Sequence, residues 1–282
     1  MVGGMSDAEG LIAARGAAIG SAGEDDLRAA AAREVRRDYG TIVVIGGGCY
    51  GSYYVRQLGR AWSAGALRWQ RLVVVDRDPQ CRVARAGLAG DAGSPHIIVS
   101  DWSDYLDRYL ADAALDPSGA ERDAIVPSPL MPHLAFEWLE RRARARWPHR
   151  QVARLPLDRA PEVPWQRPGT DGTHYVSFAE WMCPINCIEP ARCPATRGPR
   201  SWSMPPTVRA LVAAERERGI VLAGPLLFHC VHRAFGVGMF DSADLLAADA
   251  VVAARAAESA AQFLVGTVSH CHGALGRLSI GE

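Results

Sequence analysis

The chain has 282 residues and a hydrophobic fraction of 49%, enough to fill the core of one large domain or two modest ones. Lysine plus arginine and aspartate plus glutamate both number 31, and no stretch approaches the ~20 unbroken apolar residues of a membrane helix, so neither a nucleic acid nor a membrane is an expected partner. Seven cysteines without an export-type leader favour a cytoplasmic protein whose thiols bind metal or do redox chemistry.

Changes of composition predict four parts. Residues 1–37 are rich in alanine and are expected to form a flexible tail. Residues 38–155 alternate strand-like with helix-like segments, which predicts an α/β fold with a doubly wound, Rossmann-like parallel sheet. Residues 156–206 are rich in proline and cysteine and predict a loop segment with a metal site. Residues 207–282 predict a C-terminal α/β unit.

Within the second part, residues 41–76 predict a βαβ unit with a nucleotide-binding turn. An apolar strand over 41–45 precedes the turn GGGCYG at 46–51, a helix follows to about residue 62, and a second strand ends on Asp76. Glycines suit a tight turn, close approach of the backbone to a pyrophosphate and close packing of the helix on its strand. The expected cofactor contacts are Gly46, Gly47, Gly48, Cys49, Tyr50, Gly51, Asp76 and Arg77.

The cofactor expected at this turn is an adenine dinucleotide. The carboxylate of Asp76 suits the ribose of NAD, whereas Arg77 beside it leaves NADP open because a guanidinium pairs with a 2′-phosphate. The free N–H groups and positive dipole of the helix start suit the phosphates. The alternative is a doubly wound domain whose glycines serve packing alone.

Further strands are expected over 96–99, 123–126 and 152–155, with helices over 80–88, 105–114 and 133–147. Ligands of such folds lie outside the carboxyl ends of the strands, so Ser128 and His133 would face the nicotinamide side. His133 is a candidate for moving protons, and Ser128 and His174 are further catalytic candidates. Each also has an ordinary role available, in the first helical turn, in a loop or in packing.

The segment over about 41–155 resembles the TrkA-type (RCK) nucleotide-binding domain, a Rossmann family. The resemblance rests on VIGGGCYG at 44–51, VVDRDP at 74–79 and the later strand DAIV at 123–126. It covers about two fifths of the chain, and its motifs are shared with many NAD(P) dehydrogenases. It implies binding of NAD(H) or an adenine nucleotide, often for sensing without turnover. Nothing after about residue 155 resembles that family's usual ligand-sensing partner domain.

The third part contains three cysteines at C-x3-C-x5-C spacing, namely Cys183, Cys187 and Cys193. Thiolates bind zinc and iron–sulfur clusters, and a looped backbone lets closely spaced thiols converge on one centre. Proline follows two of the three cysteines, which favours an iron–sulfur cluster over zinc, but the spacing matches no standard signature. Free buried or redox-active thiols are the alternative.

The C-terminal part predicts a second βαβ-like unit, with a strand over 220–232, a long helix that begins after Asp241 and extends to about Gln262, and a strand over 263–269. Residues two apart on a strand share a face, so two pairs near the strand ends are candidate metal ligands. They are Cys230 with His232, and His270 with His272. Neighbouring parallel strands would bring the pairs together.

These features predict a cytoplasmic redox protein that binds NAD(P)(H) and a cysteine-ligated zinc ion or iron–sulfur cluster, and that acts on a small-molecule substrate or a redox partner protein. The alternative is a TrkA/RCK-like nucleotide sensor without turnover, with a structural metal site. A homo-oligomer is compatible with either hypothesis.

Overall fold

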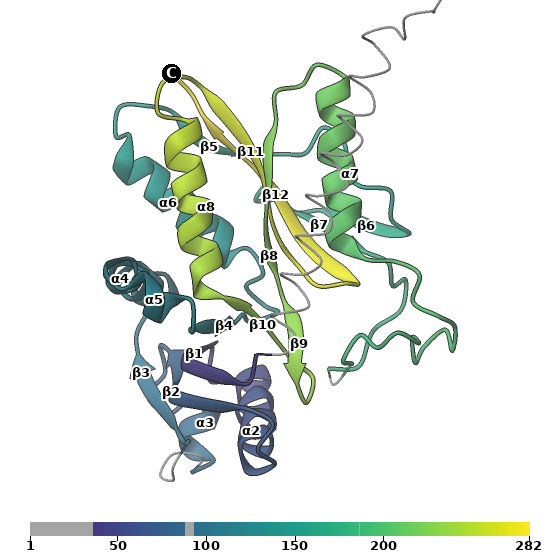
Figure 1. The fold of residues 1–282 in the computed structure, drawn as a ribbon. Helices are drawn as coiled ribbons and strands as arrows, with labels where there is room; N and C mark the ends of the chain where they lie inside the picture. Colours follow the sequence, from purple (N-terminus) through teal and green to yellow (C-terminus); the bar gives the residue numbers. More distant parts are fainter. Residues whose placement is uncertain (1–35, 88–92, 186) are drawn as a thin grey trace, which may run out of the picture. The chain divides into compact units, whose positions relative to one another are not determined.

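The computed structural model describes residues 36–87, 93–185 and 187–282 (Figure 1). The predicted flexible tail over 1–37 lies outside the described residues except for its last two positions. The predicted α/β class is confirmed, since the described residues form seven helices and two six-stranded sheets. None of these helices has both the length and the apolar character needed to cross a membrane.

The first sheet has the strand order β3-β2-β1-β4-β10-β9. Its strands are β1 (Asp38–Ile45), β2 (Arg68–Asp76), β3 (Pro95–Val99), β4 (Ala124–Val126), β9 (Val231–Ala234) and β10 (Val237–Asp241). The first four run parallel, but β10 is antiparallel to β4 and to β9. The sheet is therefore mixed, which corrects the prediction of a wholly parallel, doubly wound sheet.

The continuous apolar run of β1 follows from burial on both faces. Ile42 and Val44 point toward α2 (Cys49–Ser63) and pack with Val55 and Leu58 of that helix. Val43 and Ile45 point to the other face and pack with Leu106 and Leu110 of α4 (Trp102–Leu115). A strand covered on both faces has no polar alternation, so its hydrophobic run identifies a central strand.

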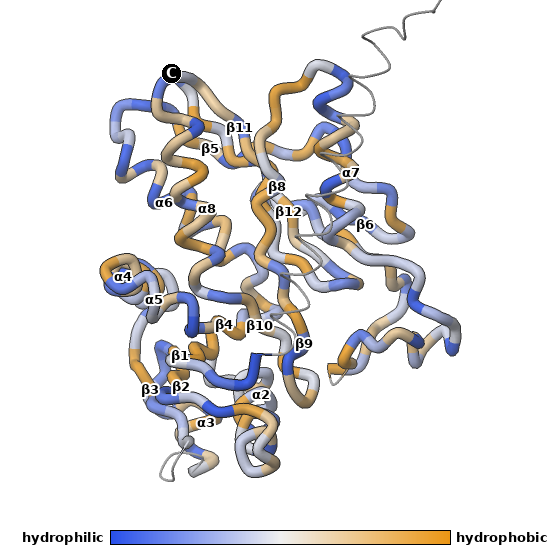
Figure 2. Tube along the Cα trace, viewed as in Figure 1, coloured by the Kyte–Doolittle hydropathy of each residue, from blue (hydrophilic) through white to orange (hydrophobic). Residues whose placement is uncertain are grey.

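The second sheet is built from the later part of the chain, with the order β6-β7-β12-β11-β8 and β5 paired to β12. Its strands are β5 (Val152–Leu155), β6 (Trp165–Pro168), β7 (His174–Ser177), β8 (Ala223–His229), β11 (Ala261–Val268) and β12 (His272–Ile280). The predicted parallel pairing of β8 with β11 is confirmed, and the other strand pairs are antiparallel. Figure 2 shows hydrophobic residues along β8.

Strands from one predicted part of the chain also pair with strands from another part. β5 was expected to end the nucleotide-binding sheet, but it pairs antiparallel with β12 of the second sheet. β9 and β10 were not expected in the first sheet, yet β10 pairs with β4. β6 and β7 lie in the segment predicted to be a loop, but β7 pairs antiparallel with β12 on one side and with β6 on the other.

The remaining helices cover the two sheets. They are α3 (Arg82–Arg85), α5 (Pro117–Ala120), α6 (Leu134–Arg146), α7 (Met204–Glu217) and α8 (Ser242–Arg255). α6 and α8 pack on one face of the second sheet and α7 packs on the other (Figure 1). α8 ends at Arg255, before the predicted end near Gln262, because β11 begins at Ala261.

Candidate functional site: a cavity at the ends of β1 and β4

The glycine turn has the backbone geometry that its sequence requires. Gly46 has a φ of +86°, a conformation that side-chain-bearing residues rarely adopt. A Cβ at Gly51 would overlap the carbonyl oxygen of Gly46, so α2 approaches the turn as closely as only glycine permits. A Cβ at Gly47 would overlap the Sγ atom of Cys81. Both the turn and the packing of α2 against it therefore depend on glycine.

Gly48 differs from these glycines because nothing lies within 4 Å of a Cβ built there, and its φ is −75°. It is the N-cap residue of α2, and no side chain caps the helix. The space above the first helical turn is thus open, next to backbone N–H groups whose dipoles favour an anion.

Asp76 and Arg77 make contacts that their positions in sequence did not reveal. The Asp76 carboxylate accepts hydrogen bonds from the Gly47 amide at 2.6 Å and from the Asp78 amide at 2.9 Å, so it braces the glycine turn. Arg77 pairs with Asp101, the N-cap residue of α4. The acid predicted to contact ribose is therefore already bound to the turn, and the neighbouring arginine is paired elsewhere.

A cavity of about 940 Å³ lies beside the turn. It is bounded by Cys49 and Tyr50 after β1 and by Pro127, Ser128 and Pro129 after β4. β2 and β4 flank β1 on opposite sides, so the gap between β1 and β4 is the topological switch point of the parallel strands, where open α/β sheets bind their ligands. The second sheet supplies further walls, among them Tyr175, Thr267 and His272.

The cysteine segment contributes two of its three thiols to this cavity. Cys183 and Cys187 line it, whereas Cys193 is buried away from it, with its amide bonded to the Gly198 carbonyl at 2.9 Å. Burial raises the pKa of Cys183, and the nearby Cys187 adds to the shift. Cys193 also raises the pKa of Cys183, so the three thiols lie near one another although only Cys183 and Cys187 line the cavity.

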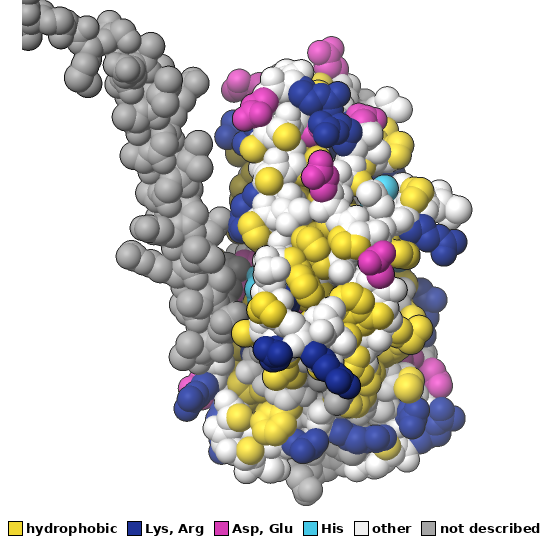
Figure 3. Space-filling model, turned by 90° about the vertical axis from the view of Figure 1, so that its right-hand side faces the viewer, with side chains coloured by type: hydrophobic (Ala, Val, Ile, Leu, Met, Phe, Trp, Pro, Cys, Tyr) yellow, Lys and Arg dark blue, Asp and Glu magenta, His cyan; other side chains and the backbone are white. Residues whose placement is uncertain are grey.

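Large hydrophobic side chains are exposed on the same segment. Met182, Ile185 and Ile188 are 97%, 43% and 55% exposed. Figure 3 turns toward the viewer the side on which Figure 1 places α7 and the loop after β7, and hydrophobic side chains gather in the middle of that face.

Glu189 connects the cysteine segment to the turn between β11 and β12, which borders the cavity. Its buried carboxylate accepts hydrogen bonds from the Ser269 hydroxyl at 2.6 Å and from the amides of His270 and Cys271 at 2.9 and 3.1 Å. Burial opposes its ionisation, but these bonds and the nearby His232 outweigh burial and hold the pKa below its ordinary value. The Glu189 backbone has a φ of +48°, a strained conformation that persists only where the surroundings hold it.

The predicted pair Cys230 and His232 lines the cavity, and both residues lie against Gly238. Burial, with a smaller contribution from Glu189, raises the pKa of Cys230 to about 12. The Nδ1 atom of His232 lies 4.0 Å from the Glu189 carboxylate, and burial lowers the pKa of that ring. At neutral pH the thiol is therefore protonated and the imidazole is neutral.

His270 and His272 do not share a strand face, which corrects the prediction. β11 ends at Val268 and β12 begins at His272, so the intervening residues form a tight turn. His270 points to the Ser203 hydroxyl, 2.9 Å from its Nδ1, and packs edge-on against His229. Only His272 lines the cavity.

A metal centre does not follow from these positions. Among the described residues, no group of three or more His, Cys, Asp or Glu side chains is placed to hold a metal ion. Glu189 is taken up by three donors, and burial raises the pKa of the Cys271 thiol to about 12, as it does for Cys230. The donors do not fit zinc or an iron–sulfur cluster in this arrangement, and the predicted metal centre stays a prediction.

Of the three catalytic candidates predicted from the sequence, only Ser128 lines the cavity. Ser128 is buried in the cavity wall. His133 does not line the cavity; it precedes α6, and its Nε2 lies 3.4 Å from Glu137 in the next turn. His174 bonds to Gln166 on β6, also away from the cavity.

Some lining residues could not be found from sequence. Glu189 lies two residues after Cys187 and resembles any loop carboxylate, and Tyr54 resembles a packing residue of α2. Cys271 lies within the SHCHG run at 269–273. The run therefore pointed to the turn that reaches the cavity, but its alternation predicted His270 with His272, whereas Cys271 and His272 line the cavity.

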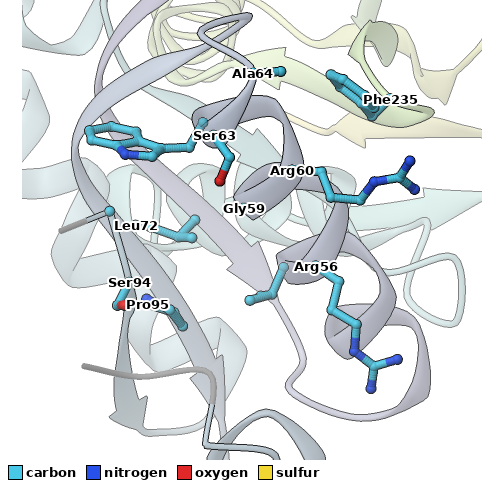
Figure 4. A pocket seen from close by; sticks show the side chains of 12 residues that line it. Arg56, Gly59, Arg60, Ser63, Ala64, Leu72, Ser94, Pro95 and Phe235 are labelled. Carbon is cyan, nitrogen blue, oxygen red and sulfur yellow. The ribbon is translucent and has the colours of Figure 1, made fainter. Parts of the chain in front are cut away.

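A second hollow, of about 880 Å³, lies at the other end of α2 (Figure 4). Arg56 and Arg60 project from α2 beside it, and Trp62 and Phe235 also line it. The residues described around it include no histidine, cysteine or carboxylate. The cavity at the ends of β1 and β4 is therefore the better candidate for chemistry.

One family model, described as "Uncharacterized protein, C-terminal domain" (AF_1314_C), matches residues 135–281, just over half of the chain. The chain belongs to the AF_1314_C family. The AF_1314_C range contains the cavity residues Glu189, His232 and His272, whereas the glycine turn precedes it. Comparison with curated proteins and with solved structures gave no match.

Proposed function

We propose that the protein binds NAD(H) at the glycine turn and transfers a hydride between it and a substrate held in the adjoining cavity. The observation that carries the proposal is the continuity of this cavity, which extends from the first turn of α2 to His232 and His272. A diphosphate on the open N-terminus of α2 would direct the rest of the cofactor along the gap between β1 and β4. Bound NAD supplies hydride acceptance and donation.

The parallel strands support the resemblance to the TrkA-type nucleotide-binding domain as part of this proposal. The order β3-β2-β1-β4 around the glycine turn is that of one mononucleotide-binding half, β3-β2-β1, followed by the first strand of a second half. The antiparallel strands β10 and β9 take the place that the other strands of the second half would occupy.

We favour NAD over NADP. Each Asp76 oxygen accepts one backbone hydrogen bond and has further acceptor capacity for a ribose hydroxyl. A 2′-phosphate would meet this carboxylate, and Arg77 would have to leave Asp101 to compensate for its charge.

A nucleotide sensor without turnover is the second candidate, and the exposed Met182, Ile185 and Ile188 favour it. The segment that carries them also lines the cavity, so nucleotide occupancy would change a hydrophobic surface that a partner protein can read. Oxidation of NADH coupled to reduction of a carbonyl compound would contradict this candidate.

Gly48→Asp tests the nucleotide site. Aspartate is a favoured N-cap residue and the position is open, so we expect thermal stability to be equal or higher. Its carboxylate would stand where the diphosphate binds, and we expect the Kd for NADH, measured by fluorescence titration, to rise at least about tenfold.

The matched control is Gly59→Ala on the same helix, where a Cβ also meets nothing within 4 Å. We expect its Kd to stay within about twofold, because residue 59 is about three turns from the N-terminus of α2. Equal NADH affinity for Gly48→Asp and the unmodified protein would overturn the proposed site, as would an unmodified protein that binds no NADH.

A further inference from the structure

The hydrogen bonds of Ser177 bear on which nitrogen of His272 carries the proton. The Ser177 hydroxyl accepts from the Ala179 amide at 2.9 Å, and its single hydrogen has two acceptors in reach, the Ala179 carbonyl at 2.8 Å and Nδ1 of His272 at 3.0 Å. When the hydrogen goes to the nearer acceptor, the carbonyl, the hydroxyl can only accept from Nδ1 of His272. In that arrangement the neutral ring has its hydrogen on Nδ1 and its lone pair on Nε2.

His272 is also the ring that a ligand in the cavity can reach. It is exposed and lines the cavity, whereas Glu189 is buried and already accepts three hydrogen bonds, and His232 is bonded to the Ile188 backbone. Desolvation lowers the pKa of His272, so the ring is neutral at neutral pH and can accept a proton.

The charge of the cavity selects the class of compound. Among the described residues that line it there is no lysine or arginine, and Glu189 is the one carboxylate. A carboxylate or phosphate on the substrate would lose its hydration without gaining a counter-charge. The hydroxyl groups of Tyr54, Ser128 and Thr267 suit an uncharged polar group instead, and proline, tyrosine and valine side chains suit an apolar remainder.

We propose, on the basis of the proposed function, that the substrate is an uncharged alcohol or the corresponding carbonyl compound, and that Nε2 of His272 is its proton acceptor and donor. In the oxidation, Nε2 of His272 would accept the O–H proton, and NAD⁺, when bound, would accept the C–H hydride. The products are a ketone or aldehyde, NADH and an imidazolium, which returns its proton to water at the cavity opening. Ser177 is the positioning residue, since it holds the lone pair toward the cavity.

Two matched probes test the substrate class. 4-Fluorobenzyl alcohol and 4-fluorobenzoate share one ring and differ in charge, and ¹⁹F NMR reports the binding of each to the full chain saturated with NAD⁺. We expect the alcohol to bind at least about tenfold more tightly than the benzoate. Absence of alcohol binding, or benzoate binding of equal strength, would overturn the assignment.

Variants locate the proton acceptor. His272→Asn keeps a donor for Ser177 but has no atom at Nε2, so we expect the alcohol to bind at least about tenfold more weakly with the Kd for NAD⁺ unchanged. His174→Asn, on β7 and away from the cavity, is the control and should change neither Kd. Unchanged alcohol binding in His272→Asn with NAD⁺ bound would overturn this inference alone, whereas loss of NAD⁺ binding by the unmodified protein would overturn the proposed function.

The tautomer gives a readout that needs no ligand. In ¹⁵N-labelled protein near neutral pH, we expect the His272 ring to show a protonated Nδ1 and an unprotonated Nε2. Ser177→Ala removes the acceptor, and the two tautomers should then mix. A ring with its hydrogen on Nε2 in the unmodified protein would contradict the role given to Ser177.

Discussion

Gly51→Ala is expected to destabilise the protein by about 4 kcal/mol or more and to abolish NADH binding. The added Cβ would overlap the Gly46 carbonyl oxygen, a backbone atom that cannot rotate away. Either α2 moves off its strand or the turn opens, and both changes disrupt the packing of Val55 and Leu58 on Ile42 and Val44. Urea unfolding measures the loss of stability, and fluorescence titration measures the loss of binding.

Gly59→Ala, on the same helix, is expected to change the free energy of unfolding in the opposite direction. Its Cβ would meet no atom within 4 Å, and alanine is favoured over glycine in a helix interior, so we expect a gain of about 0.5 to 1 kcal/mol. If both variants gained stability, this would contradict the close approach of α2 to the glycine turn at Gly51.

Glu189→Gln is expected to cost about 3 kcal/mol in the free energy of unfolding. The amide would present hydrogens to at least one of the three donors that now bind the carboxylate, at Ser269, His270 and Cys271. Glu180→Gln is the control, because Glu180 is an exposed carboxylate of the same segment, and we expect a change below about 0.5 kcal/mol. Equal unfolding curves for the two variants would contradict the central role of Glu189.

The pH dependence of this difference has a defined sign. The pKa of Glu189 is lower in the folded than in the unfolded protein, where it is about 4.3. Its contribution is therefore complete above that unfolded value and is lost as the pH falls through the folded value. We expect the stability gap between the unmodified protein and Glu189→Gln to narrow below about pH 4.

Local patterns predicted the elements better than the sheets that they form. β1, β2 and α6 are marked by continuous apolar runs or by helical periodicity, and all three are found close to their predicted bounds. β5 has the composition of a sheet strand whichever sheet it joins, so its pairing with β12 could not be read from its four residues. β10 pairs with β4 across more than a hundred residues, and no local signal specifies such a partner.

For the site, too, the sequence predicted the local segments better than their arrangement in space. The glycine turn and the two cysteine–histidine runs marked the places where the chain reaches the cavity, because residue types with few structural uses cluster there. Which members face inward was set by a turn between β11 and β12 and by Glu189, and both depend on contacts between distant segments. Alternation alone therefore predicted that His270 and His272 share a strand face, but the two residues lie in and after a turn and do not share one.

The pairing of β4 with β10 also bears on synthesis of the chain. The hydrophobic strand β4 leaves the ribosome more than a hundred residues before its neighbour, and until then one of its edges has no hydrogen-bonding partner. An open apolar edge is a template for association between chains, so the nascent N-terminal half depends on rapid completion of translation or on a chaperone. A fragment ending after β5 would retain that edge permanently and would aggregate.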